Sequence, residues 1–148
     1  MAFRESVHVW LTFPSQLAYI SLAEGIARAI FHAYAGTEDE RDNYLLAFHE
    51  AVANAVIHGN RQDASKFVEI HFILEPDGWT VEVWDQGSGF DPTHLPDPTA
   101  PENLLNPHGR GIFLIRAMIE RVDFQMTARG TCVRMQQRTP YRNPIVGA

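Results

Sequence analysis

The longest regular pattern of apolar and polar positions runs from Thr37 to Asn60 and predicts one amphipathic helix. Thr37 suits the N-cap, Glu40 follows three residues later as in a capping box, and Gly59 occupies the place of a left-handed C-terminal residue. Apolar side chains recur at spacings of three and four along one face: Tyr44, Leu45, Phe48, Ala51, Val52, Ala55 and Val56. We expect this face to lie in the core.

Three polar residues follow the edge of that apolar face. Glu50, Asn54 and His58 lie in one line, because residues four apart advance by only about 40° around a helix. A carboxylate, an amide and an imidazole in register indicate a binding or catalytic edge, although a solvated flank is the alternative. A zinc-protease motif is excluded, because His49-Glu50 is followed by Ala53 where a second histidine is required.

The remaining pattern predicts strands joined by tight turns and two further helices. Strands are expected at 7–13, 67–74, 79–84, 122–127 and 131–137, with a hairpin turn at 75–78, and helices at 15–34, capped by Ser15, and from Gly109 to about Arg121. Tight turns between strands imply antiparallel pairing. We therefore expect an α+β fold, a two-layer sandwich of a mixed, mainly antiparallel sheet with helices on one face. Residues 1–138 would form a single domain, followed by a flexible tail at 139–148.

The charge and composition of the chain disfavour some kinds of partner and location. The 148 residues include 18 Asp and Glu against 12 Lys and Arg, which gives a net charge of −6 and makes nucleic acid an unfavourable partner. There is one cysteine, Cys132, in a strand-like run, so we expect a core residue rather than a nucleophile. The sequence shows neither a signal peptide nor a membrane-spanning apolar run, so a cytoplasmic location without membrane association is expected.

Two glycine-containing segments lie where they could serve a ligand. The segment 85–90, Asp85-Gln86-Gly87-Ser88-Gly89-Phe90, follows a strand, and Gly109-Arg110-Gly111 opens a helix, whose free backbone N–H groups can bind phosphate. Neither extends to G-x-G-x-x-G. The alternatives are a turn-capping role for Asp85 and simple flexibility for the glycines. Between them, 91–108 is rich in proline and contains no lysine or arginine, as expected of a lid, a binding loop or a disordered segment.

In this order the segments resemble the ATP-binding domain of the GHKL superfamily, which comprises gyrase, heat-shock chaperone, histidine kinase and mismatch-repair ATPases. Residues 50–60 look like its N-box, 85–90 and 109–115 like its two glycine boxes, and Gly130-Thr131 like its final box. The forms E-A-x-x-N-A-x-x-H-G and G-x-G-x-x-L-I-R are most similar to the bacterial anti-sigma-factor serine/threonine protein kinases. The resemblance implies the Bergerat-type ATP-binding fold.

The resemblance also implies ATP and Mg²⁺ as cofactors and a role for each residue. Asp85 would accept a hydrogen bond from the exocyclic amine of adenine, with Thr131 nearby through water. Asn54 would be a ligand of Mg²⁺, and Glu50 would take the proton of an attacking hydroxyl or hold that hydroxyl in line. Further nucleotide contacts would come from His58, Gly87, Gly89, Phe90, Gly109, Arg110 and Gly111. For His58 a structural hydrogen bond is the alternative.

The implied activity is that of an anti-sigma factor kinase. It would bind a sigma factor and phosphorylate a serine or threonine of an anti-sigma-factor antagonist, and a homodimer is possible. The alternative is a non-catalytic module that binds ATP, or merely keeps the fold, and sequesters a partner. Glu50 favours the enzyme, whereas the lid at 91–108 favours the module, because kinases of this family can carry a basic residue there.

Overall fold

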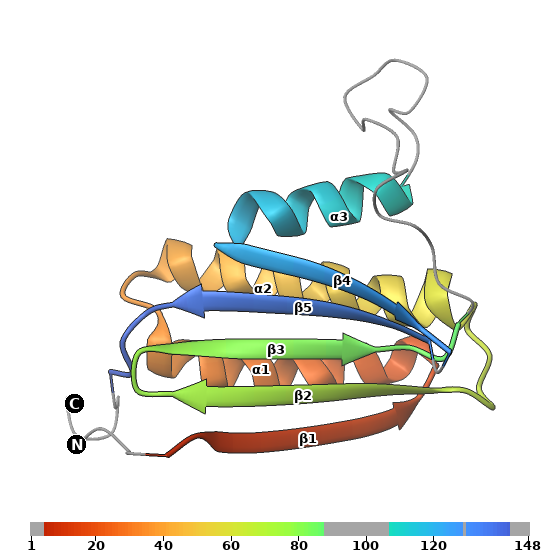
Figure 1. Ribbon diagram of the computed structural model, residues 1–148, viewed down its shortest axis with the longest axis horizontal. Helices are drawn as coiled ribbons and strands as arrows, with labels where there is room; N and C mark the ends of the chain where they lie inside the picture. The colour runs from red at the N-terminus through yellow and green to blue at the C-terminus, as the bar shows by residue number, and fades with distance from the viewer. Residues whose placement is uncertain (1–4, 88–106, 129, 143–148) are drawn as a thin grey trace.

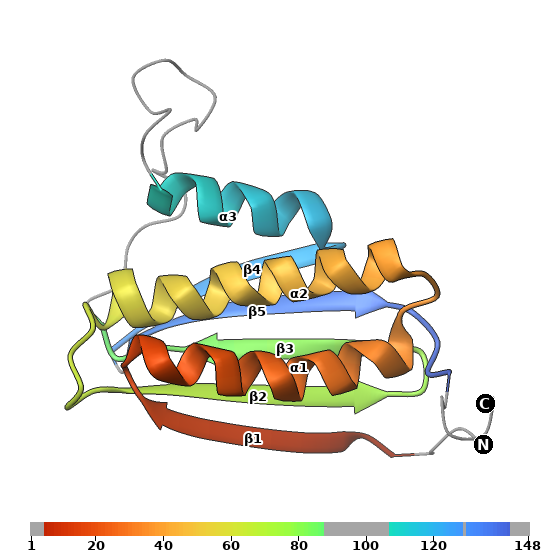
Figure 2. The same cartoon turned by 180° about the vertical axis from the view of Figure 1, so that it is seen from behind.

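The protein is described by a computed structural model for residues 5–87, 107–128 and 130–142, and of 107–110 by the backbone alone. The elements are β1 (Val7–Pro14), a 3-10 turn η1 (Leu17–Tyr19), α1 (Ile20–Tyr34), α2 (Glu38–Ala53), a π-helical segment η2 (Asn54–Gly59), β2 (Phe67–Glu75), β3 (Gly78–Trp84), α3 (Pro107–Met118), β4 (Arg121–Thr127) and β5 (Gly130–Arg138). The strands form one sheet in the order β1-β2-β3-β5-β4, and the helices cover one face of it (Figures 1 and 2).

This arrangement confirms the predicted α+β sandwich with helices on one face. Neighbouring strands pair antiparallel throughout the described part of the sheet, so the sheet is antiparallel rather than mixed. The hairpin of β2 and β3 is also confirmed, with Glu75 opposite Gly78. Strand β1 lies at one edge and β4 at the other (Figure 1).

The core lies between the helices and the sheet. Phe48 of α2 stacks on Phe72 of β2 with 5.7 Å between ring centroids, and Phe31 of α1 lies 4.8 Å from the ring of Trp79 on β3. Each such side chain stabilises the fold by about 1.5–3 kcal/mol when fully buried. This packing fixes α2 against the sheet and so fixes the position of the polar residues along its edge.

The start of α2 follows the sequence prediction. Thr37 Oγ1 accepts a hydrogen bond from the backbone N–H of Glu40 at 3.1 Å. The Glu40 carboxylate reaches back to the N–H of Gly36 at 3.0 Å, one residue before the group used in a capping box. The Glu40 N–H, one of the unpaired donors of the first turn, is thereby satisfied, and the predicted N-cap is confirmed.

The end of this helix differs from the prediction. The α-helix ends at Ala53 and continues as η2, in which hydrogen bonds span five residues, as between Asn60 N–H and the Ala55 carbonyl at 2.8 Å. Gly59 does not adopt a left-handed conformation; Arg61 and Gln62 do, with φ of 53° and 56°. The predicted α-helix to Asn60 and the predicted role of Gly59 are therefore wrong, because tertiary contacts of Gly59 decide its conformation.

Two other predicted helix starts are corrected. Ser15 does not cap a helix: η1 intervenes before α1, and the buried Ser15 hydroxyl instead accepts a hydrogen bond from Asn60 Nδ2 at 2.7 Å. Helix α3 begins at Pro107, two residues before Gly109. Proline is common at the first position of a helix, because it has no N–H to leave unsatisfied there.

The first residues after β5 are attached to the domain. The buried Thr139 hydroxyl donates to the backbone carbonyl of Tyr34 at 2.8 Å, and the Tyr141 ring lies edge-on to the Tyr34 ring at 5.6 Å. These contacts hold 139–142, the beginning of the predicted flexible tail, against the end of α1. The rest of that tail, 143–148, lies outside the described residues.

Candidate functional site

Helices α2 and α3 meet at a carboxylate and an amide. A Cβ atom placed on Gly111 of α3 would lie 3.0 Å from Glu50 Oε2 and 3.0 Å from Asn54 Nδ2. The backbone of α3 therefore lies directly against these two side chains, and any residue larger than glycine would crowd them. Three residues predicted for one site from separate segments of the sequence thus come together.

The predicted line of polar residues continues from α2 into the π-helical segment η2. Asn54, the first residue of η2, is buried, whereas His58 near its end is exposed. The wider i→i+5 turn replaces the α-helical spacing from which the line was predicted. His58 is therefore more open to solvent than Asn54, and its predicted nucleotide contact stays a prediction.

A second part of the site forms around Asp85 at the end of β3. Asp85 is buried, and its carboxylate accepts a hydrogen bond from the Gly87 N–H at 2.8 Å. The backbone N–H of Asp85 donates to the Thr131 carbonyl at 2.9 Å. Burial raises the pKa of Asp85, an effect opposed in part by the backbone hydrogen bonds of Gly87 and Thr131. A buried carboxylate of raised pKa is typical of functional sites.

Close backbone packing explains why glycine occurs next to this carboxylate. A Cβ atom on Gly59 would lie 2.4 Å from Asp85 Cγ, and one on Gly87 would lie 2.0 Å from the Gly59 carbonyl oxygen. Neither position can hold a larger residue without a shift of its neighbours. The end of η2 and the loop after β3 are therefore in direct contact, which brings the predicted N-box and first glycine box together.

Several buried polar atoms of the site lack a partner. Asn54 Nδ2 and Thr131 Oγ1 are two of the five buried side-chain nitrogen and oxygen atoms for which the described residues provide no hydrogen bond. A buried polar atom without a hydrogen bond destabilises the folded state unless a ligand or a water molecule supplies the missing partner. The Asn54 Nδ2 donor suits a phosphate oxygen, the amide oxygen of the same side chain suits Mg²⁺, and the Thr131 hydroxyl suits a base or a water, so the side chains present fit a magnesium-bound adenine nucleotide.

Sequence analysis missed Asn60, which is fully buried. Its Nδ2 donates to Ser15 Oγ at 2.7 Å and to the Phe67 carbonyl at 2.9 Å, while its Oδ1 accepts from the Gln86 N–H at 2.7 Å. One side chain thus joins the end of η2 to β2 and to the residue after Asp85. An asparagine after a glycine is typical of an exposed helix end, so no signal in the sequence separates it from an ordinary cap.

Some predicted site residues are only partly placed. Gly89 and Phe90 lie outside the described residues, as does 91–106 of the predicted lid. The last two lid residues, 107–108, belong to α3, and Gly109 and Arg110 lie in its first turn. The predicted contact between Arg110 and a phosphate therefore stays a prediction.

Other kinds of site find no support in the described part of the chain. No group of three or more His, Cys, Asp and Glu side chains there could hold a metal ion. None of the helices described combines the length and apolar character needed to cross a membrane. Cys132 is buried in β5, as predicted, and burial raises the pKa of its thiol to about 12, so it is not a reactive thiolate.

Comparison with known families gives a match to most of the chain. A family model described as the histidine kinase-like ATPase domain matches residues 13–137. That range contains all the predicted site residues and all the described strands except the first part of β1 and the last residue of β5.

Curated proteins similar to this chain include serine-protein kinases named RsbW. The protein from Staphylococcus epidermidis is 26% identical over 122 residues, which are 78% of this chain and 77% of the relative. The protein from Staphylococcus aureus is 28% identical over 116 residues, 74% of this chain and 73% of the relative. The similarity therefore extends over most of each protein.

Solved structures support the fold. The RsbU and RsbW domains of Rv1364c from Mycobacterium tuberculosis superpose with a TM-score of 0.64 at 16% identity, over 90% of this chain and 32% of that one. A histidine kinase domain from Erythrobacter litoralis superposes with a TM-score of 0.50 at 18% identity, over 86% of this chain and 61% of that one. This chain thus spans about a third of the first structure's length, and at these identities the likeness concerns the fold alone.

Proposed function

The chain belongs to the family of histidine kinase-like ATPase domains, and we propose that it is a serine/threonine protein kinase that uses ATP and Mg²⁺. In this proposal it acts as an anti-sigma factor in a partner-switching system, binding a sigma factor and phosphorylating an anti-sigma-factor antagonist. The similarity to serine-protein kinases supports the kinase activity. The anti-sigma role rests on the motif forms around Glu50 and Gly111. A cytoplasmic location and a homodimer are part of the same proposal.

One observation carries the proposal: Glu50 and Asn54 lie against the backbone of Gly111, near the N-terminal end of α3. The N-terminal end of a helix favours phosphate through its free N–H groups and its dipole. An amide oxygen is a suitable ligand for Mg²⁺, which otherwise keeps water and phosphate oxygens. A carboxylate one helical turn away can act as a base, which supports this role for Glu50.

The chain's own residues would divide the work between binding and proton transfer. Bound Mg-ATP would supply the phosphoryl group to be transferred. Glu50 would receive the proton of the serine or threonine hydroxyl, or hold that hydroxyl in line. Asn54 would offer its amide oxygen to Mg²⁺, and the N–H groups of 109–111 would hold phosphate oxygens.

The Asp85 end of the site would select the base. An ionised carboxylate only accepts hydrogen bonds, so Asp85 would favour a purine that presents a donor, as adenine does with its exocyclic amine. The Thr131 hydroxyl, for which the described residues provide no partner, would take part through water. The contacts of Gly59 and Gly87 with Asp85 and with each other would keep the carboxylate in place.

A second candidate is a non-catalytic module that binds ATP and sequesters a protein partner. The specific observation in its favour is that 91–108 contains neither lysine nor arginine, so the predicted lid offers no permanent cation to the terminal phosphate. Arg110 would then be the nearest such group in the sequence. The two candidates share nucleotide binding and differ in phosphoryl transfer.

Incubation with γ-labelled ATP, Mg²⁺ and a panel of candidate antagonist proteins separates the two candidates. We expect label on a serine or threonine of one antagonist, and none when that residue is replaced by alanine. An antagonist or sigma factor that binds the chain while no label is transferred to any protein would instead support the sequestering module.

A further inference from the structure

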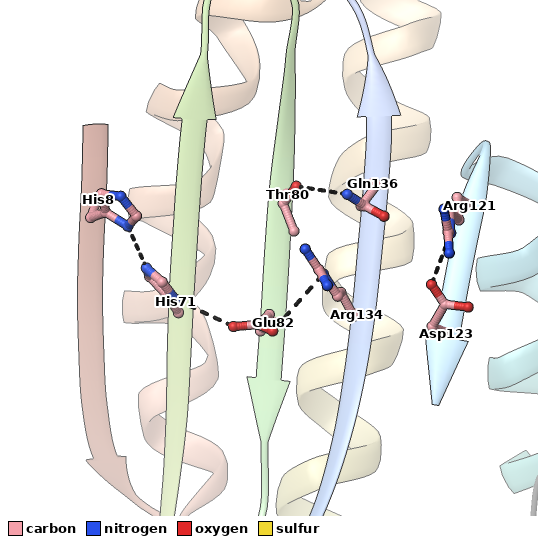
Figure 3. Close-up of polar contacts among 8 residues, drawn as sticks. All are labelled: His8, His71, Thr80, Glu82, Arg121, Asp123, Arg134 and Gln136. Atoms are coloured by element: carbon pink, nitrogen blue, oxygen red, sulfur yellow. Dashed lines mark hydrogen bonds and ion pairs between the residues drawn. The ribbon is translucent and has the colours of Figure 1, made fainter. Parts of the chain in front are cut away.

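The face of the sheet opposite the helices is not covered by any described residue (Figures 1 and 2). A chain of polar side chains crosses its strands (Figure 3). Nδ1 of His8 lies 2.8 Å from Nε2 of His71, whose Nδ1 lies 3.3 Å from Glu82 Oε1. The second oxygen of Glu82 lies 3.9 Å from Nε of Arg134. The side chains on this open face therefore hold one another in fixed positions across four strands.

A pocket of about 630 Å³ opens on the same face, within the usual size range of ligand sites. Three aromatic residues, Trp10, Phe67 and Trp84, contribute to its lining. The Trp10 side chain is 65% exposed and that of Phe67 is 43% exposed. Exposed aromatic surface gathered around a concavity is typical of an interaction site.

The Trp10 ring is held in place before any partner arrives. It stacks on the His71 ring with centroids 3.5 Å apart and planes 8° from parallel. His71 is in turn held by His8 and Glu82. Since the ring is already ordered, little conformational freedom would be lost on binding.

The charges of the pocket are all of one sign. Its described lining contains three carboxylates, Glu69, Glu82 and Asp85, and no lysine, arginine or histidine. Glu82 is engaged with His71 and Arg134. The exposed Glu69 carboxylate makes no hydrogen bond or ion pair within the described part of the chain.

Glu69 lies among the aromatic residues. It pairs directly with Trp84 of the neighbouring strand and, with side chains alternating along β2, shares its face with Phe67 two residues earlier. A carboxylate beside aromatic faces is complementary to a cation that can both stack and donate hydrogen bonds. A guanidinium group does both, since it is planar and its N–H groups match the two oxygens of a carboxylate.

We propose that this pocket, on the open face of the sheet, binds an arginine side chain of a partner protein; at its end the pocket reaches Asp85, which also belongs to the proposed nucleotide site. A second copy of the chain is a poor occupant, because two-fold pairing would bring the same carboxylates of both copies together. The proposal rests on Glu69 and the aromatic residues, which the proposed nucleotide site does not use, so arginine binding and nucleotide binding can fail separately.

The three tryptophans allow a direct test by NMR of their indole N–H signals. Trp10 and Trp84 line the pocket, whereas Trp79 is buried in the core and serves as an internal reference. The probe is N-acetylarginine amide, and its control is N-acetylcitrulline amide, which keeps the shape and lacks the charge. With arginine we expect saturable shifts of the Trp10 and Trp84 signals at roughly millimolar concentration. We expect no shift of Trp79 and at least about tenfold weaker binding of citrulline.

Variants sharpen the test. Glu69→Gln should weaken arginine binding by about tenfold or more, whereas Glu75→Gln, the same change at the other end of β2, should not. An unchanged Trp79 signal verifies folding. No saturable shift, an equal response to citrulline, or unaltered binding in Glu69→Gln would overturn the proposal. So would a wild-type dimer in sedimentation that Trp10→Ala dissociates, because the occupant would then be a second copy.

Discussion

Around Asp85 most hydrogen bonds are made between protein groups, whereas the amide of Asn54 at the other end of the site has an unused donor. Asp85 is bonded to Gly87, and Asn60 holds the next residue, Gln86. The buried Asn54 Nδ2 has no partner among the described residues. We infer that, apart from the Thr131 hydroxyl, the protein builds the base-binding end in advance, and that it leaves the phosphate-binding end to be completed by ligand.

The largest expected effect concerns the phosphate end and the reaction. Glu50→Gln keeps the shape of the side chain and removes the base, so phosphoryl transfer to an identified antagonist should fall at least about 100-fold. Nucleotide affinity, measured by calorimetry, should stay within about twofold. Glu38→Gln, the same change at the start of α2, is the control and should transfer at the wild-type rate. Equal rates for wild type and Glu50→Gln would remove Glu50 from the reaction.

At the base end, Asn60→Ala should cost about 2–3 kcal/mol of unfolding free energy, because it removes three hydrogen bonds and leaves the Gln86 N–H unpaired. Ser15→Ala removes only one of these bonds and should cost about 1 kcal/mol. Urea unfolding measures both. Nucleotide affinity should fall more in Asn60→Ala than in Ser15→Ala; a fall of the same size in both variants would mean that Asn60 does not position the Asp85 loop.

Glycine substitutions test the close packing at the same end. Gly59→Ala would place a methyl group 2.4 Å from Asp85 Cγ, so we expect a loss of about 1–3 kcal/mol in stability and weaker nucleotide binding. Gly25→Ala is the matched control, because no atom lies within 4 Å of the added methyl in the middle of α1. It should stabilise the fold by about 0.5–1 kcal/mol. Similar thermal shifts for the two variants would contradict this packing.

The smallest expected effect is a pH dependence that separates stability from binding. Burial raises the pKa of Asp85, so the folded state holds this proton more tightly than the unfolded state. The contribution of Asp85 to stability should therefore be fully present below the ordinary aspartate pKa of about 3.9 and be lost as pH rises through the raised value. Asp85→Asn has no carboxyl group to ionise, so its free energy of unfolding should exceed that of wild type at pH 7. The difference between the two should shrink as the pH is lowered. Urea unfolding between about pH 3 and 8 measures it, and a constant difference would exclude the linkage.

Much of the fold was predictable because its signals are local. The apolar alternation of the strands and the N-cap at Thr37 need only neighbouring residues to act, and the structure confirms both. The π-helical turn after Ala53 was not predictable, because it arises where the helix end packs on the loop of Asp85. The same contact explains why Gly59 was assigned the wrong role.

The site was predictable in part for a similar reason. The spacing of Glu50 and Asn54, four residues apart, survives because α2 is regular up to Ala53. The contact of Gly111 with this pair depends on how α3 packs against α2. The order of the motifs indicated that the two segments share a site, but it could not give the position of one helix on the other. Asn60 was missed because its partners, Ser15, Phe67 and Gln86, lie in three distant segments.

Calorimetric titration of ATP with and without Mg²⁺ tests most directly the claim that one nucleotide is held by Asp85 at one end and by Asn54 at the other. Asp85→Asn should weaken binding by about tenfold in both conditions, because the lost contact is to the base. Asn54→Ala should weaken binding more when Mg²⁺ is present than when it is absent, because its amide oxygen serves the metal. Wild-type affinity in both variants, or a magnesium dependence that survives Asn54→Ala, would contradict the proposed site.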